Sequence, residues 1–97
     1  MRMVFIICEA NVEDRVIESL LEIGVPGYTR TTATAEGFGI HGRREGSAVW
    51  PGYNSTIITV VPDDVSAVIS ETMATLREER QGRLAIHVYS VAADVLL

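Results

Sequence analysis

The chain has 97 residues, of which 47% are hydrophobic and 22% charged, and its formal net charge is −5 at pH 7. This length fits a single domain, residues 1–97, and the composition is typical of a globular protein rather than a disordered one. The acidic balance argues against a nucleic-acid-binding surface, and one cysteine, Cys8, excludes a disulfide within the chain. Neither a signal peptide nor a membrane-spanning stretch is recognisable, so we expect a cytoplasmic protein.

The first part of the chain is predicted to form a strand, a helix and a second strand. Residues Met3–Cys8 are a continuous apolar run rich in β-branched side chains, which is typical of a strand buried on both faces. Asn11 can cap the helix that follows, Gly24 can end it, and Pro26 prevents it from resuming. The Thr-rich segment Tyr28–Ala35 is predicted to be a weakly hydrophobic strand. The helix is expected to bury Val16, Ile17, Leu20 and Leu21, and to expose Glu13, Asp14, Glu18 and Glu22.

The last part of the chain is predicted to form a strand, a helix and a strand again. Tyr53–Val61 reads as the third strand, and Pro62 ends it. Asp63 and Asp64 then supply an N-terminal cap for a helix that runs to about Arg80. Arg83–Val91 follows as the fourth strand. The apolar positions of this helix are Val65, Val68, Ile69, Met73 and Leu76.

The predicted order βαββαβ indicates an α+β, ferredoxin-like fold. Right-handed crossovers place both helices on one face of a four-stranded antiparallel sheet. The first and third strands carry apolar side chains on both faces, and Tyr89 and Val91 join them from the fourth. A single subunit would leave the face without helices as a large apolar patch, so we expect other subunits to cover it.

The segment Glu36–Gly52 is predicted to be a long glycine-rich loop between two strands, and it is the first candidate for function. It contains five of the eight glycines, the only tryptophan (Trp50), His41, and the adjacent pair Arg43 and Arg44. Loops of this length in small domains are usually functional or mobile. Glycines let a ligand approach the backbone, and arginines offer charge to an anion, although two arginines at a solvated tip are an equally ordinary interpretation.

Residues 37–42 of this loop match the pattern G-x-G-x-x-G. In a dinucleotide-binding fold those glycines open a helix. Here RREGSAVWPG follows, whose glycines and proline cannot form that helix, so we reject the dinucleotide fingerprint. A backbone nest for a smaller anion remains open.

Other reactive side chains give weak signals. His41 and His87 suggest a metal, but two histidines without further ligand spacing are poor grounds, and His87 is better explained as an interface residue of the last strand. Cys8 is expected to be a small buried hydrophobic side chain. No nucleophile, base or paired carboxylates form a recognisable catalytic set, so we predict that the protein is not an enzyme and has no metal site.

Three motifs together resemble the PII nitrogen-regulatory signalling proteins: EIGVPGYTRT at 22–31, GFG at 37–39 and VVPDD at 60–64. The resemblance covers nearly the whole chain. It implies a homotrimer of ferredoxin-like subunits with their sheets facing inward. It also implies that ATP or ADP, often with 2-oxoglutarate, binds in clefts between subunits. The loop after GFG, called the T-loop in that family, would dock onto a regulated transporter, enzyme or transcription regulator.

The resemblance also assigns roles to residues, and the chain departs from the family in several of them. His41 stands where a Gln is expected, and Gln81-Gly82-Arg83 replaces a longer GDGK stretch, with Arg83 in the place of its Lys. The T-loop is short and lacks the Tyr-Arg-Gly modification site, and no Arg-x-Arg pair follows the last strand. The implied contacts to a small anionic effector are Thr29, Gly37, Phe38, Gly39, His41, Gly82 and Arg83. The implied contacts to the partner protein are Arg43, Arg44 and Trp50.

Two alternatives to this effector-binding regulator stay open at the level of sequence. The Trp50 and Gly52 pair is weakly similar to a loop of the trimeric CutA divalent-cation-tolerance proteins, which would make the chain a metal-binding trimer that uses His41. The other alternative is a purely protein-binding module. For the effector-binding regulator, we expect the loop 36–52 to change conformation when a ligand binds, and the fluorescence of Trp50 to report that change.

Overall fold

The computed structural model describes residues 1–35, 37–39, 42–44, 53–79 and 84–97. Its elements follow the predicted order, with a short hairpin added between the second and third strands of the main sheet. They are β1 Arg2–Glu9, a 3-10 turn Ala10–Val12, α1 Glu13–Ile23, β2 Thr29–Ala35, β3 Gly37–Gly39, β4 Gly42–Arg44, β5 Asn54–Val61, α2 Asp63–Glu78 and β6 Ile86–Ala92.

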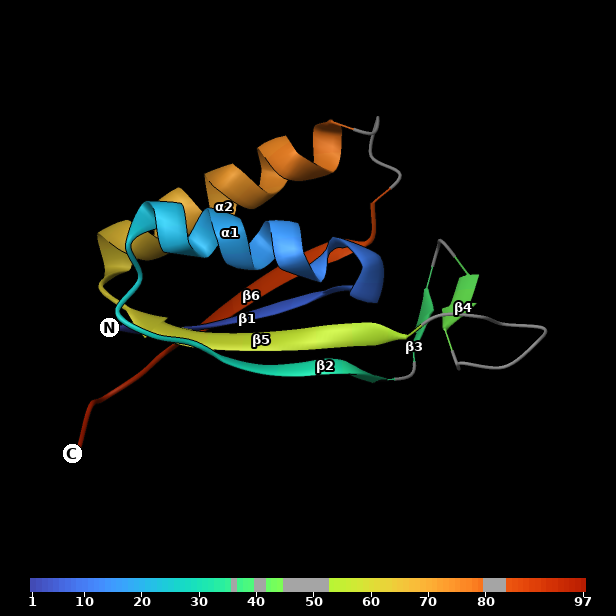
Figure 1. Ribbon diagram of the computed structural model, residues 1–97. Helices are drawn as coiled ribbons and strands as arrows, with labels where there is room; N and C mark the ends of the chain where they lie inside the picture. The colour runs from blue at the N-terminus through green and yellow to red at the C-terminus, as the bar shows by residue number, and fades with distance from the viewer. Residues whose placement is uncertain (36, 40–41, 45–52, 80–83) are drawn as a thin grey trace.

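The molecule has two layers, a sheet and a pair of helices (Figure 1). The main sheet has four strands in the order β2-β5-β1-β6, and each neighbouring pair is antiparallel. Both helices lie on one face, while the opposite face carries no helix (Figure 1). This confirms the α+β, ferredoxin-like fold that the sequence indicates.

The core lies between the helices and the sheet, and strand alternation selects its members. Along β1 and β5 every second side chain is buried, which is the pattern of a sheet with one covered face. Residues directly opposite each other in an antiparallel pair share a face, so the register joins buried positions to buried positions. The fully buried side chains include Val4, Ile6, Val16, Leu20, Ile57, Val61, Ile69 and Met73.

The face without helices is apolar as well. Phe5 on β1 lies opposite Ile58 on β5 and Tyr89 on β6, and one step along Met3 lies between two valines. Tyr89 is 59% exposed, although it stands in the middle of this apolar row. Both faces of the central strands therefore carry apolar side chains, as predicted.

The helix ends partly differ from expectation. Gly24 has φ 88° and its N–H donates to the carbonyls of Leu20 and Leu21, so it ends α1 in the left-handed conformation as predicted. Asn11 is not the cap of α1, because residues 10–12 form a 3-10 turn and no side-chain cap bond is made. The cap expected from Asp63 and Asp64 is also wrong. They occupy the first turn of α2, which begins without a side-chain cap.

Three further expectations need correction. Leu21 and Val68, assigned to the apolar helix faces, are 61% and 46% exposed. The last strand begins at Ile86 rather than Arg83, and the buried Leu84 and Ala85 precede it. The stretch expected to be an unstructured loop contains the paired strands β3 and β4.

Candidate functional site

Within the glycine-rich segment, residues 37–39 and 42–44 pair as two short antiparallel strands, called the hairpin below, at the end of the sheet where β2 finishes (Figure 1). Gly37 lies opposite Arg44, Phe38 opposite Arg43, and Gly39 opposite Gly42. A strand with two glycines in three positions allows close approach of a ligand to its backbone. The hairpin thus places the arginine pair on the strand beside the GFG motif.

The rejection of a dinucleotide fingerprint is confirmed. Within residues 37–44 the described positions form two β-strands, and no helix opens there to receive a pyrophosphate. The G-x-G-x-x-G pattern is therefore a feature of a hairpin.

Thr29 lies at the opposite end of β2 from this hairpin. It is exposed, begins the strand and stands opposite Ile58 on the helix-free face. At the usual rise of a β-strand, the six steps from Thr29 to Ala35 span roughly 20 Å. Thr29 and the hairpin therefore lie at different ends of β2 within one subunit, and the proposed ligand contact of Thr29 stays a prediction.

The other expected ligand and partner contacts fall in two groups. Arg43 and Arg44 belong to β4, as described above. His41, Trp50, Gly82 and Arg83 lie outside the described residues, so their proposed roles stay predictions.

The sequence analysis missed a buried carboxylate, that of Glu13 in the first turn of α1. Glu13, expected on the solvated face of α1, is only 4% exposed, and its Oε1 has no hydrogen-bond partner. Arg30 Nη1, from the edge strand β2, lies 3.9 Å from Glu13 Oε2 and 3.8 Å from Asp14 Oδ1. The only sequence hint was Arg30 itself, a charged residue within a strand, since Glu13 alone matches an ordinary acidic first turn.

Cys8 lies under the same helix and is inert. It is 1% exposed, and burial, with the nearby charges of Glu13 and Glu9, raises the pKa of its thiol to about 12. A thiol with this pKa has almost no thiolate at neutral pH and is therefore a poor nucleophile or metal ligand. The expectation of a small buried hydrophobic side chain is confirmed.

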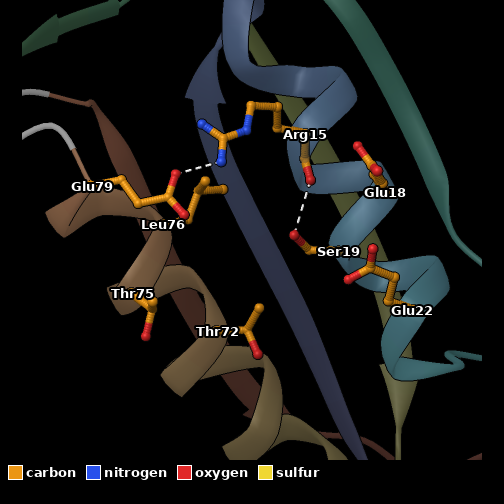
Figure 2. Close-up of a pocket in the computed structure, with 8 residues that line it drawn as sticks. All are labelled: Arg15, Glu18, Ser19, Glu22, Thr72, Thr75, Leu76 and Glu79. Atoms are coloured by element: carbon orange, nitrogen blue, oxygen red, sulfur yellow. Dashed lines mark hydrogen bonds and ion pairs between the residues drawn. The ribbon is translucent and has the colours of Figure 1, made fainter.

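A groove of about 360 Å³ runs between the two helices, and Figure 2 shows that carboxylates and hydroxyls line it. Arg15 and Glu79 form an ion pair across one end of it. The hydroxyl of Ser19 donates to the carbonyl of Arg15, and the threonines on α2 donate likewise within their own helix. With its donors occupied and its carboxylates Glu18 and Glu22 exposed, this groove is unsuited to an anion.

Charge is unevenly distributed over the fold. Eight of the thirteen acidic residues lie in α1 and α2, where only Arg15 and Arg77 oppose them. Six of the eight arginines lie outside these two helices, and Arg30, Arg43 and Arg44 are among them. The helix layer therefore repels an anion, whereas the segments outside it, with six arginines and five acidic residues, are close to neutral.

Potential metal ligands do not cluster in the part of the chain that the structure describes. No three His, Cys, Asp or Glu side chains there are placed to hold an ion. His87 is exposed on the helix-free face, opposite Ile7. Neither helix of the described ranges is long and apolar enough to cross a membrane.

A family model for nitrogen regulatory protein P-II matches residues 1–95. No curated protein matches the chain.

Several solved structures that resemble the chain are PII-like proteins. The chain is 29% identical to a putative PII-like signalling protein of Thermus thermophilus, with a TM-score of 0.64, covering 93% of this chain and 83% of that one. It is 26% identical to CPII of Thiomonas intermedia, a nitrogen regulatory PII-like protein bound to ADP, AMP and bicarbonate. That match has a TM-score of 0.69 and covers 95% of this chain and 88% of CPII. The apo form of CPII, aligned at 19% identity, supports the fold alone.

Proposed function

The chain belongs to the nitrogen regulatory protein P-II family, and from this we propose that it is a regulatory protein rather than an enzyme, one that binds a small anionic effector. The observation that carries the proposal is the uneven charge, with a strongly acidic helix layer and six of the eight arginines outside it. We propose ADP, AMP or ATP as the effector, since CPII, a similar structure, holds ADP and AMP. Such a regulator would act in the cytoplasm, where adenine nucleotides are available.

The proposed assembly is a homotrimer whose sheets face inward. Its support is the helix-free face, where Phe5, Ile58 and Tyr89 form one apolar row and Tyr89 is 59% exposed. Burying such a surface against other subunits is favourable in proportion to its apolar area. No other element of the described residues covers this face in one subunit (Figure 1).

The proposed effector site lies in a cleft between subunits and includes β2, which is an edge strand of the sheet. Thr29 at one end of β2 and the GFG motif beyond its other end lie too far apart for one compact anion. A nucleotide is elongated, with its base at one end and its phosphates at the other. We place the site in a cleft between subunits, with the base near Thr29 of one subunit and the phosphates near the hairpin end of a neighbouring subunit. The expected phosphate contacts are Gly37, Phe38, Gly39, His41, Gly82 and Arg83.

The loop 36–52 is the proposed contact with a regulated transporter, enzyme or transcription regulator. Arg43 and Arg44 on β4 supply cations beside GFG, so a bound anion and a partner protein would compete for or share the same arginines. Trp50 adds a large apolar side chain of the kind that dominates protein interfaces. This places effector and partner on one continuous segment.

Ligand-dependent melting tests the proposal. The purified protein is heated with ADP, AMP, ATP, bicarbonate, Zn²⁺ or Cu²⁺, each alone. A ligand of the folded state at 100 times its Kd stabilises by about 2.7 kcal/mol, which raises the melting temperature by several degrees. We expect this rise with an adenine nucleotide, and a smaller rise for Arg83→Ala and Thr29→Ala.

The matched control is Thr75→Ala, an exposed threonine on α2 in the groove that is unsuited to an anion, which should respond like the unmodified protein. A shift with metals and none with nucleotides would replace the proposal by the metal-binding alternative. No shift with any ligand would leave only a protein-binding role.

A further inference from the structure

Strand β6 presents three side chains at alternate positions to the helix-free face, and these are His87, Tyr89 and Val91. All three are exposed, Tyr89 at 59% and Val91 at 51%. The apolar side chains that β1 and β5 contribute to this face are already half-buried. A neighbouring copy that covers the face therefore buries the most new apolar area per side chain along β6.

His87 is the one of these three side chains whose charge changes near neutral pH. The register places it opposite Ile7 and two residues from Tyr89, which lies opposite Phe5. Its imidazole makes no hydrogen bond or ion pair with any of the described residues. A neutral imidazole is compatible with a covered apolar surface, whereas an imidazolium would lose its water there without gaining a partner.

Charged groups near His87 on this face are few among the described residues. Glu9 lies on β1 two residues beyond Ile7, which places it diagonally from His87 at about 7–8 Å in a regular sheet. Glu9 has an interaction of its own, and no ion pair joins it to His87. Thr56 on β5 and Tyr89 are uncharged at neutral pH, and both helices lie behind the sheet (Figure 1). A second copy brings the same groups, so Glu9 is the only acid of the described face that can screen a charge on His87.

We propose that His87 makes assembly of this chain sensitive to pH, with copies joined through the helix-free face while the imidazole is neutral and separated once it is protonated. Histidine ordinarily changes charge between about pH 5 and 8. In a free subunit the exposed His87 takes up its proton in water, whereas in the assembly the apolar surroundings oppose the proton. Assembly is therefore complete above this pH range and is lost as pH falls through it.

This inference rests on the proposed inward-facing trimer and has a consequence for the proposed effector site. That site lies between subunits, so it exists only in the assembled form. A ligand bound there should hold the subunits together, because binding to one form shifts the equilibrium toward that form. Acid would therefore oppose effector binding, and a bound effector would oppose dissociation by acid.

Sedimentation equilibrium at pH 8.0 and pH 5.5, over a range of protein concentrations, tests the proposal. At about pH 5.5, roughly one unit below the ordinary pKa of histidine, keeping one imidazole neutral costs a factor of about ten. Three imidazoles in a trimer lower the association constant by about a thousandfold, so the concentration at half assembly should rise about thirtyfold. Circular dichroism at both pH values checks that the subunits remain folded.

Two substitutions separate the effect of the charge from the presence of the side chain. His87→Gln is neutral at both pH values and should give the same concentration at half assembly at pH 8.0 and pH 5.5. His87→Lys is charged at both and should raise that concentration already at pH 8.0. The matched control is His41→Gln, because His41 is the other of the two histidines, and this variant should keep the pH dependence of the unmodified protein.

The proposed pH dependence would be overturned by equal half-assembly concentrations of the unmodified protein at the two pH values. It would equally be overturned by a pH dependence that persists in His87→Gln or disappears in His41→Gln. Tighter assembly at pH 5.5 would also overturn it, since the protonated His87 would then have found an acid in the assembly. A chain that stays monomeric at pH 8.0 at every concentration refutes the trimer, and a trimer without pH dependence refutes the role of His87 alone.

Discussion

Arg30 Nη1 lies 3.9 Å from Glu13 Oε2, and this contact ties the edge strand β2 to the first turn of α1. The Glu13 side chain is 5% exposed, so its carboxylate is buried, and among the described residues Arg30 is its ion-pair partner. Arg30 is also 3.8 Å from Asp14, whose side chain is 98% exposed. The two acids therefore make the same kind of contact in opposite environments.

Replacing Arg30 should destabilise the fold through Glu13. Arg30→Leu leaves a charged acceptor buried without a cation, which costs about 1–3 kcal/mol of unfolding free energy. Asp14→Ala removes the exposed contact and should change stability by no more than about 0.5 kcal/mol. Urea denaturation of both variants measures the difference. Equal effects from the two would show that burial of Glu13 has no energetic consequence.

Gly24 should resist substitution although nothing crowds it. An added Cβ meets no atom within 4 Å, yet φ is 88°, a region that costs an L-residue about 1–2 kcal/mol. Gly24→Ala should therefore lower the unfolding free energy by about 1 kcal/mol. Gly27→Ala is the control, because that position is equally open and its φ is not positive, so it should be neutral or slightly stabilising. If Gly24→Ala leaves the unfolding free energy unchanged, the positive φ at this position does not strain an L-residue.

The strand order and the end of α1 could be predicted because their signals are local. Apolar runs, helical periodicity and Gly24 each report on a few neighbouring residues. The start of α1 could not be predicted in the same way. Asn11 has the residue type of a helix cap, but nothing in the sequence reveals that residues 10–12 form a 3-10 turn before the helix. The hairpin of residues 37–44 was missed because glycine and arginine carry little strand propensity.

The candidate site was harder to predict than the fold because its parts are distant in sequence. Glu13 looks like an acid of an exposed helical face, and only the partner on β2, seventeen residues later, distinguishes it. Thr29 and the GFG motif were grouped as effector contacts by family resemblance, although the length of β2 separates them by about 20 Å within one chain. The resemblance describes a site shared by subunits, which one chain cannot display.

Stability should fall at alkaline pH because of Cys8. Its pKa in the folded state is about 12 against an ordinary value of 9.0, so the folded protein holds the thiol proton more tightly. The contribution is complete below pH 9 and is lost as pH rises toward 12, with a slope of about 1.4 kcal/mol per pH unit. Urea denaturation from pH 8 to 11 should show this slope, and Cys8→Ala should reduce it. The chain has no lysine, so the tyrosines are the main background titration. An identical slope in both proteins would contradict the assignment.

If the trimer forms with its sheets facing inward, a charged substitution should disrupt assembly at one exposed apolar residue and not at another that is equally exposed in the single subunit. Tyr89, on the helix-free face, is 59% exposed, and Leu21, on α1, is 61% exposed. Tyr89→Glu would bury an unpaired carboxylate between subunits, which costs about 3–5 kcal/mol, and should dissociate the trimer. Leu21→Glu should leave it intact. Light scattering should then give the mass of one 10.6 kDa chain for Tyr89→Glu and about three times that mass for Leu21→Glu. Circular dichroism checks that both remain folded. If Leu21→Glu dissociates the assembly and Tyr89→Glu does not, the subunits meet through their helices.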